Sequence, residues 1–456
     1  MTIWTPDLKD RVGPLYQAIA NAIAEDLSAG QLAAGQQLPT QRVLATELDV
    51  ALTTVTRGYA EAERRGLVSG EVGRGTFVRG GMGAPPSTDA DREQVDLTQN
   101  ELGPWAHAQE LGASIARVAG QLHGGGVFDY QPPGGTERQR AAGAQWMTRA
   151  GLEAAAEDVL ITSGAQHGMA LTFATIADPG DTVFTDVVTY SGMKSLAHLL
   201  RLRLKGLEMD EYGLLPDAFA TACREEGAKA LYCMPSLHNP TGILMPEQRR
   251  REIAGIANDY GLPIVEDDSY GFLVPDETPI SAYADTAYYL AGTSKSLAAG
   301  LRIGFLLPPE SMVDRLKAAI SSTTYSVSPL MGDVVAGWIF DGTADRVMEW
   351  KRGEVAQRQA MAQRILGGYT SDPHPLSQQL WLSVPEPWCT PEFVSQAEMR
   401  GVLISPAEDF VAGRATPPHA VRVCLGPVAD TARLEGALQT LASILDGPPE
   451  PCQVVM

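Results

Sequence analysis

The sequence predicts two folded units: an N-terminal winged helix-turn-helix over residues 1–79 and a larger α/β domain over residues 95–456. The first prediction rests on three helical stretches that are followed by two short strand-like runs. The second rests on apolar runs that alternate with helical stretches, the pattern of a mainly parallel sheet. From about residue 345 the pattern indicates a smaller α+β subdomain. Residues 80–94 are rich in glycine and proline, lack periodicity and predict a linker.

In the N-terminal unit the first helix is expected over residues 14–29, where apolar residues recur at every fourth position. The second and third helices are expected over 41–48 and 53–65. In the third, Val55, Tyr59 and Ala62 are expected to face inward, and Gly66 follows as the end signal. Two short strands, joined by a glycine-rich hairpin, complete the unit at 67–69 and 76–78.

A series of apolar runs of strand length predicts the α/β domain. Those of the main sheet are 159–162, 182–185, 230–234, 263–266, 287–291 and 302–307, and those of the small subdomain are 379–384, 401–404 and 420–425. Ligands collect at the carboxyl ends of strands in open α/β sheets, so polar residues that follow these runs are candidates for a site.

Charge and composition narrow the cellular setting. The net charge is −20, but residues 1–80 carry eight basic and nine acidic side chains, so nearly all of the excess lies beyond them. Charge therefore neither excludes DNA binding nor supports it. Five widely spaced cysteines without a Cys-x-x-Cys pair favour a reducing cytoplasm over disulfides or a zinc site. Without a signal peptide or an apolar run of about 20 residues, no membrane partner is expected.

One strand end carries a lysine in the run Gly292-Thr293-Ser294-Lys295-Ser296. A lysine amine condenses with an aldehyde, and burial or a neighbouring cation makes it a better nucleophile. Arg302 follows seven positions later, and its planar guanidinium suits a phosphate. Ser294 would donate its hydroxyl to the same phosphate. Taken alone, however, such a lysine is more often a solvated surface charge.

Three further strand ends complete the pattern. Asp267, after a buried run, suits the ring nitrogen of a pyridine, and Tyr270 and Asn239 suit its phenolic oxygen. Ala165 and Gln166, in Ser163-Gly164-Ala165-Gln166, open a helix whose free amide groups favour a phosphate. Each piece has a plain alternative, namely a helix cap, a turn or a surface cation. Together, in this order, they predict one cofactor site.

These motifs carry a resemblance to known families. Residues 125–430 resemble the fold-type I, class I/II aminotransferases, which depend on pyridoxal 5'-phosphate (PLP). Residues 14–79 resemble the winged helix of GntR-type regulators through Pro14-Leu15-Tyr16, Leu38-Pro39-Thr40-Gln41-Arg42, Gly66-Leu67-Val68 and Gly73-Arg74-Gly75-Thr76-Phe77-Val78. The two in this order identify the chain as a member of the MocR subfamily of GntR regulators.

The resemblance implies a role for each matching residue of the PLP site. Lys295 would form the Schiff base, Asp267 would pair with the pyridinium, and Asn239 and Tyr270 would contact the phenolic oxygen. The others would bind phosphate (Ala165, Gln166, Ser294, Arg302), stack on the ring (Tyr190), bind a substrate α-carboxylate (Arg422) or reach the partner subunit's phosphate in a homodimer (Tyr130). Ala299 departs from the family, which often has proline there.

For the winged helix the resemblance implies DNA contacts through six residues: Arg42, Thr53, Thr54, Thr56 and Arg57 on the helices, and Arg74 on the wing. The alternative for each is a solvated polar face. Ala51-Leu52 stands where many GntR recognition helices begin with serine and arginine. The affinity for DNA and the operator sequence are therefore left open.

Three functions stay open at this point. The leading one is a cytoplasmic transcriptional regulator that senses an amine, an amino acid or a B6 vitamer by aldimine exchange at Lys295 and binds an operator in double-stranded DNA. The alternative is a working aminotransferase with an accessory DNA-binding domain, since the expected chemical groups are all present. The third is a B6-binding or interaction protein with neither activity.

Overall fold

A computed structural model of the chain describes residues 4–6, 15–28, 32, 36–64, 68–71, 75–78, 94–103, 105–120, 129–370 and 373–448. The chain divides into two compact units, Met1–Arg92 and Glu93–Met456. Residues 80–93 of the predicted linker lie outside the described residues, as does Arg74 on the predicted wing.

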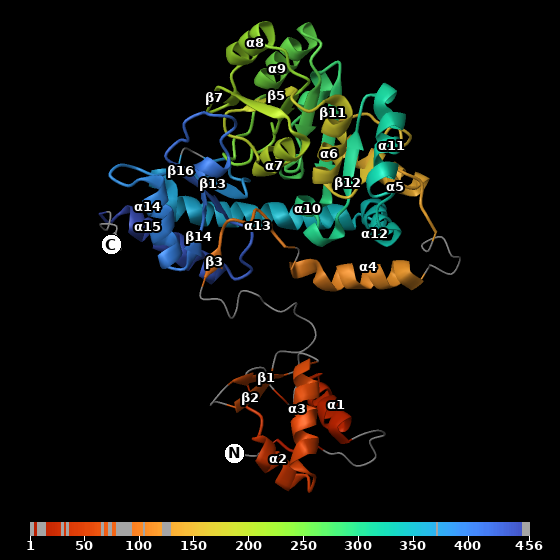
Figure 1. Cartoon of the computed structure of the whole chain (residues 1–456), viewed down its shortest axis with the longest axis vertical. Helices are drawn as coiled ribbons and strands as arrows, with labels where there is room; N and C mark the ends of the chain where they lie inside the picture. Colours follow the sequence, from red (N-terminus) through yellow and green to blue (C-terminus); the bar gives the residue numbers. More distant parts are fainter. Residues whose placement is uncertain are drawn as a thin grey trace. The chain divides into compact units, whose positions relative to one another are not determined.

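The first unit has the three helices and the hairpin that the sequence predicts (Figure 1). Its elements are α1 (Leu15–Ser28), α2 (Gln41–Glu47), α3 (Leu52–Arg64), β1 (Val68–Glu71) and β2 (Gly75–Val78), and the two strands pair antiparallel. Val55, Tyr59 and Ala62 are buried, as expected, against Ile19 and Leu44. The Tyr59 hydroxyl donates to the Pro39 carbonyl at 2.8 Å, so the turn before α2 is tied to α3.

The second unit is built on a seven-stranded sheet with the order β4-β12-β11-β10-β9-β5-β6. The strands are β4 (Leu160–Thr162), β5 (Thr182–Asp186), β6 (Arg203–Leu207), β9 (Leu231–Cys233), β10 (Ile264–Asp267), β11 (Ala287–Gly292) and β12 (Gly304–Leu307). Only β12 runs antiparallel to its neighbours, so the mainly parallel sheet is confirmed. The edge strand β6 was not predicted, because its sequence Arg-Leu-Lys-Gly-Leu lacks a continuous apolar run.

Helices and short elements surround this sheet (Figure 1). The helices are α4 (Ala108–Gly120), α5 (Glu137–Arg149), α6 (Ala165–Ile176), α7 (Ser191–Leu200), α8 (Pro216–Glu225), α9 (Glu247–Asp259), α10 (Thr293–Ser296), α11 (Val313–Thr323) and α12 (Pro329–Phe340). Short 3-10 helices span Trp105–His107, Gly271–Leu273, Ile280–Tyr283, Ala299–Leu301 and Glu310–Met312, and a hairpin is formed by β7 (Met209–Asp210) and β8 (Gly213–Leu214). Two more 3-10 helices, Gly367–Tyr369 and Ala407–Asp409, belong to the small subdomain.

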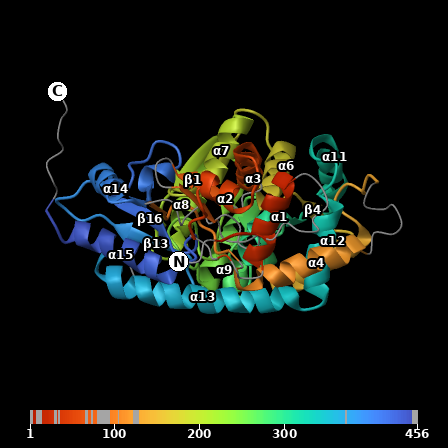
Figure 2. The same ribbon diagram turned by 90° about the horizontal axis from the view of Figure 1, so that it is seen from below.

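The small subdomain is reached through α13 (Thr343–Leu366), a long helix that runs from α12 to α15 (Figures 1 and 2). It contains β13 (Gln379–Ser383), α14 (Thr390–Met399), β14 (Val402–Leu403), β15 (Ser405–Pro406), β16 (Ala420–Cys424) and α15 (Thr431–Leu445). Strands β13, β16 and β15 form an antiparallel sheet. The predicted strand 401–404 pairs instead with β3 (Val95–Asp96), parallel and about three hundred residues earlier in the chain.

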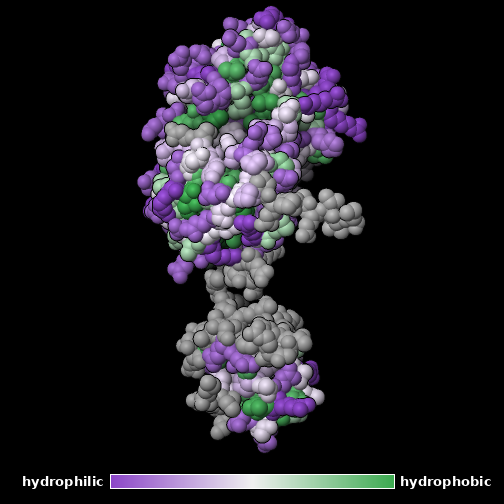
Figure 3. All heavy atoms as spheres, turned by 90° about the vertical axis from the view of Figure 1, so that its left-hand side faces the viewer, coloured by the Kyte–Doolittle hydropathy of each residue, from purple (hydrophilic) through white to green (hydrophobic). Residues whose placement is uncertain are grey.

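Within the described ranges no helix combines the length and the hydrophobicity that crossing a bilayer requires. On the face seen in Figure 3, hydrophilic residues surround scattered hydrophobic patches.

Candidate PLP site and DNA-binding face

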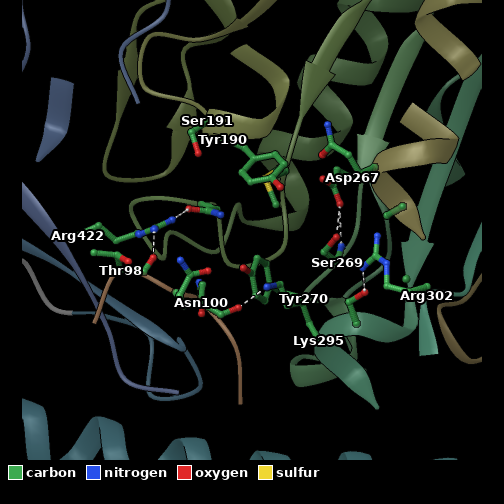
Figure 4. Close-up of a pocket in the computed structure, with 17 residues that line it drawn as sticks. Thr98, Asn100, Tyr190, Ser191, Asp267, Ser269, Tyr270, Lys295, Arg302 and Arg422 are labelled. Carbon is green, nitrogen blue, oxygen red and sulfur yellow. Dashed lines mark hydrogen bonds between the residues drawn. The ribbon is translucent and has the colours of Figure 1, made fainter. Parts of the chain in front are cut away.

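A pocket of about 480 Å³ lies where several strands of the main sheet end. It is lined by ten of the residues singled out in the sequence: Ala165, Gln166, Tyr190, Asn239, Asp267, Tyr270, Ser294, Lys295, Arg302 and Arg422 (Figure 4). Asp267 is the last residue of β10, and Lys295 lies in the short helix after β11. The main sheet thus gathers at one edge residues from Ala165 to Arg302, while Arg422 reaches the pocket from β16 (Ala420–Cys424) of the small subdomain.

Lys295 is held in a largely buried position. Its Nζ donates to the Asn100 carbonyl, and the Nζ of Lys351 on α13 donates to the Lys295 carbonyl at 2.7 Å. Burial lowers the pKa of Lys295, with a smaller lowering by Arg422, while Glu101 and Asp267 oppose the shift. A lysine with a lowered pKa is more often the free amine that attacks a carbonyl carbon.

Asp267 is fixed by hydrogen bonds from its neighbours. The Ser269 hydroxyl donates to Oδ1 at 2.5 Å, and the Tyr232 hydroxyl donates to Oδ2 at 3.1 Å. Burial raises the pKa of Asp267, and the hydrogen bonds from Ser269 and Tyr232 oppose that shift. A buried carboxylate in this setting favours a cationic partner such as a protonated pyridine. Tyr270 is also buried, which raises its pKa well above the ordinary value and keeps its hydroxyl protonated.

One side of the pocket is suited to a phosphate. The Arg302 guanidinium donates to Ser294 Oγ at 3.0 Å and lies against Gly164, where an added Cβ would meet Arg302 Nη2 at 2.8 Å. Gly164 has a φ of 89° and precedes α6, which no side chain caps. The first amide groups of α6 are therefore available to an anion, and the helix dipole favours one there.

Arg422 lies on the opposite side of the pocket from Arg302 (Figure 4). Its Nη1 donates to Asn239 Oδ1 at 2.9 Å and its Nη2 to the Thr98 carbonyl at 2.6 Å. Its guanidinium lies over the Phe410 ring, 4.6 Å from the centroid. The pocket therefore has a cation at each end and suits a ligand with two separated anionic groups, such as a phosphate and a carboxylate.

Several pocket residues were missed in the sequence. Thr98, Gln99 and Asn100 line the pocket from the segment after β3, and Ser269 lines it beside Asp267. Tyr232, which lies outside the lining, was also missed, and its hydroxyl and that of Ser269 fix Asp267. The Thr98–Asn100 segment follows a two-residue strand, so no periodicity marked it. Ser269 lies two positions after Asp267, so the sequence could have predicted a hydrogen bond between its hydroxyl and the Asp267 carboxylate.

Tyr130 does not line the pocket. It is 86% exposed, and its ring lies 4.9 Å from that of Tyr325, centroid to centroid. Such an exposed aromatic pair leaves the expected contact with a partner subunit as a prediction.

In the first unit the predicted DNA-contacting side chains are mostly exposed. Arg42, Thr53, Thr56 and Arg57 are open to solvent, and Thr54 is half-buried. The Thr56 hydroxyl donates to Gln41 Oε1 at 2.8 Å, which links the start of α2 to α3. The Arg57 guanidinium lies over the Tyr16 ring at 4.5 Å from its centroid, a cation–π contact that holds this exposed side chain against α1.

Known proteins share both halves of the chain. Residues 92–441 match the aminotransferase class I and II family, and residues 15–78 match the gntR family of bacterial regulatory proteins. The uncharacterized HTH-type transcriptional regulator YdeF of Bacillus subtilis is 30% identical over 460 residues, which is 97% of each chain.

Solved structures share the fold of the second unit. Pyrococcus horikoshii kynurenine aminotransferase superposes with a TM-score of 0.72 at 22% identity, covering 78% of this chain and 92% of that one. LysN, the α-aminoadipate aminotransferase of Thermus thermophilus, gives 0.70 at 24% identity, covering 78% and 91%. The chain therefore belongs to the MocR subfamily of GntR-type regulators, in which a helix-turn-helix domain precedes a fold-type I aminotransferase class I and II domain.

Proposed function

We propose that this chain is a PLP-dependent, DNA-binding transcriptional regulator that senses an amine, an amino acid or a B6 vitamer at Lys295. The observation that carries the proposal is the buried Lys295 amine in one pocket with Asp267, Arg302 and Arg422, in a chain that also has a GntR domain. The domain proposed to bind DNA and the lysine proposed to react thus belong to one chain.

The pocket residues fit PLP. Ala165, Gln166, Ser294 and Arg302 would hold the phosphate, and Asp267 the ring nitrogen, while Asn239 and Tyr270 would contact the phenolic oxygen and Tyr190 the ring face. Two pocket atoms, Asn100 Oδ1 and Arg422 Nε, are buried without a partner among the described residues, as expected where a ligand supplies the missing bonds. When bound, PLP supplies an aldehyde carbon that condenses with primary amines.

The chain's own residues would then turn amine binding into a signal. With the cofactor bound, an incoming amine would compete with the Lys295 amine for that carbon, and Arg422 would hold the carboxylate of the amine where one is present. The released Lys295 side chain and the altered contacts of Arg422 with Asn239 and Thr98 favour a different arrangement of the pocket. An effector shifts an equilibrium between two states only by the difference in its affinity for them. Regulation therefore requires that the two arrangements of the pocket differ in how they present the DNA-binding domains.

The proposal includes a cytoplasmic homodimer. The exposed Tyr130 and Tyr325 pair offers an aromatic contact for a second copy, and Tyr130 would reach the partner's cofactor phosphate. A dimer would present two winged helices to two half-sites of an operator in double-stranded DNA.

DNA binding under effector control is the test. The full-length holo-protein is incubated with DNA from upstream of its own and adjacent genes, and binding is measured with and without a panel of amines, amino acids and B6 vitamers. We expect specific binding whose affinity changes with at least one compound, and Lys295→Ala should bind DNA without that response. Absence of specific DNA binding at moderate salt would refute the regulator.

The second candidate is a working aminotransferase, favoured by Arg422, whose position at the far end of the pocket from Arg302 suits a substrate carboxylate. Lys295, once displaced, could move a proton between the carbon and nitrogen of the substrate. The two functions are distinguished by measuring the keto acid that forms from each amino acid of a panel when a second keto acid is present as acceptor. Many turnovers per site would favour the enzyme, and at most one would favour the sensor.

A further inference from the structure

The chain joins the second unit at the small subdomain, directly after the predicted linker. The first residues form β3, which pairs in parallel with β14, and the Leu97 amide donates to the Leu403 carbonyl at 2.9 Å. The Leu97 side chain is fully buried in the core of the small subdomain, and its carbonyl accepts from the Cys424 amide at 2.9 Å. A movement of the small subdomain therefore also moves the residues that follow the linker.

Residues 95–100, here called the entry segment, continue from β3 into the PLP pocket. The Arg422 guanidinium of β16 donates to the Thr98 carbonyl at 2.6 Å, and Nδ2 of Asn100 donates to Oε1 of Gln379 on β13. Thr98 and Asn100 both line the pocket. Through these contacts the entry segment forms a part of the pocket that belongs to the small subdomain.

Lys295 holds the entry segment from the side of the main sheet. It lies in α10, directly after β11, and its Nζ donates to the Asn100 carbonyl (Figure 4). The Lys295 backbone is itself fixed, because Nζ of the buried Lys351 donates to the Lys295 carbonyl at 2.7 Å. The Lys295–Asn100 hydrogen bond therefore joins the main sheet to the small subdomain.

This hydrogen bond needs a free lysine amine. A protonated lysine has three N–H groups, whereas a nitrogen that is double-bonded to an aldehyde carbon keeps at most one, whose direction that carbon fixes. When an effector amine takes over the carbon, its nitrogen forms the new C=N bond and the C=N bond to Lys295 breaks. The two hydrogens of the effector amine pass to the Lys295 nitrogen. Lys295 can then donate to Asn100 again.

We propose that the Lys295–Asn100 hydrogen bond is a clamp through which the PLP site controls the small subdomain and the entry segment. The clamp is closed while the Lys295 amine is free, and it opens when that amine is bound to the cofactor aldehyde. An effector that displaces Lys295 closes it again. The clamp rests on the proposed function, because it requires PLP at Lys295, and it adds the path by which amine binding leaves the pocket.

Hydrogen–deuterium exchange of the full-length holo-protein measures the state of the clamp. The probe is O-methylhydroxylamine, which condenses with the aldehyde and releases Lys295 but has no carboxylate for Arg422. The absorbance spectrum of the cofactor shows when the probe has reacted. Peptides that cover residues 95–101 should then exchange about tenfold more slowly, because a hydrogen bond from a charged donor holds the entry segment again. The β7–β8 hairpin should exchange at an unchanged rate.

Two variants fix the clamp in one state. Lys295→Arg keeps N–H donors for the Asn100 carbonyl but does not form a Schiff base, so the entry segment should exchange slowly with or without the probe. Lys295→Met is the matched control, with a side chain of similar length and no donor. Its entry segment should exchange about tenfold faster than that of Lys295→Arg, again with or without the probe.

Two outcomes would overturn the clamp. The first is unchanged exchange of residues 95–101 in the parent after the cofactor spectrum has changed, a result that no misfolded variant can explain. The second is equal exchange of these residues in Lys295→Arg and Lys295→Met. Failure of the proposed function gives a different result: absence of DNA binding, with the exchange pattern as expected, would refute the regulator and leave the clamp. If the parent bound no PLP, the comparison of the two variants would decide.

Discussion

Gly304 is the position where one added methyl group should damage phosphate binding most directly. It begins β12 and pairs with Thr162 on β4, beside the turn that opens α6. A Cβ at residue 304 would lie 2.5 Å from the Gly164 carbonyl carbon and 2.7 Å from the Ala165 nitrogen. Carbon atoms in contact lie about 3.5–4.0 Å apart, so Gly304→Ala must push the phosphate-binding turn by about 1 Å.

The expected cost follows from the packing. Overfilling a well-packed interior costs roughly 1–3 kcal/mol, which corresponds to a loss of roughly 5- to 140-fold in affinity if the strain falls on the turn. We therefore expect the dissociation constant of PLP for Gly304→Ala to exceed that for the parent by a factor within this range. Apo-protein is titrated with PLP, and the visible absorbance of the cofactor gives the dissociation constant.

Gly300→Ala is the matched control. It makes the same chemical change four residues earlier, where an added Cβ meets no atom within 4 Å. This variant should bind PLP as the parent does. Equal affinities for Gly304→Ala and Gly300→Ala would refute the assignment of the Gly164–Ala165 turn to the phosphate.

Three further outcomes are expected. Burial lowers the pKa of Lys351 to about 7, so above that pH the unfolded chain binds more protons than the folded one. The free energy of unfolding of the parent should therefore rise by about 1.4 kcal/mol per pH unit relative to that of Lys351→Met as pH rises from 7 towards 9. A difference in denaturation midpoint that does not change with pH would contradict this. Tyr232→Phe removes a donor to Asp267 and should weaken PLP binding about tenfold in the same titration, whereas Tyr288→Phe on β11, on the other side of β10, should not. Ile19→Ala should cost the first unit about 2–5 kcal/mol and abolish DNA binding in a mobility-shift assay. Because Ile19 belongs to the core of a separate compact unit, losing the cofactor spectrum as well would be the contrary result.

Local sequence patterns determined much of this protein. Helix spacing and the hairpin glycines predicted the first unit, since its contacts form between elements that follow one another closely in the chain. The motifs around Lys295, Asp267 and Asn239 predicted their common pocket, because strand ends of a parallel sheet meet at one edge.

Only the tertiary structure decided the rest. The strand at Val402 pairs with Val95, and Asn100 meets Lys295, through contacts between segments that no local pattern relates. The buried position of Lys351 on α13 could not be predicted either, since the sequence shows a lysine in a polar helix and gives no sign of the carbonyl groups that it meets. Periodicity reports which face of an element is apolar, whereas long-range packing selects the partner of that face. For this reason the sequence alone predicted the residues around Lys295, and the fold decided which distant segments contact them.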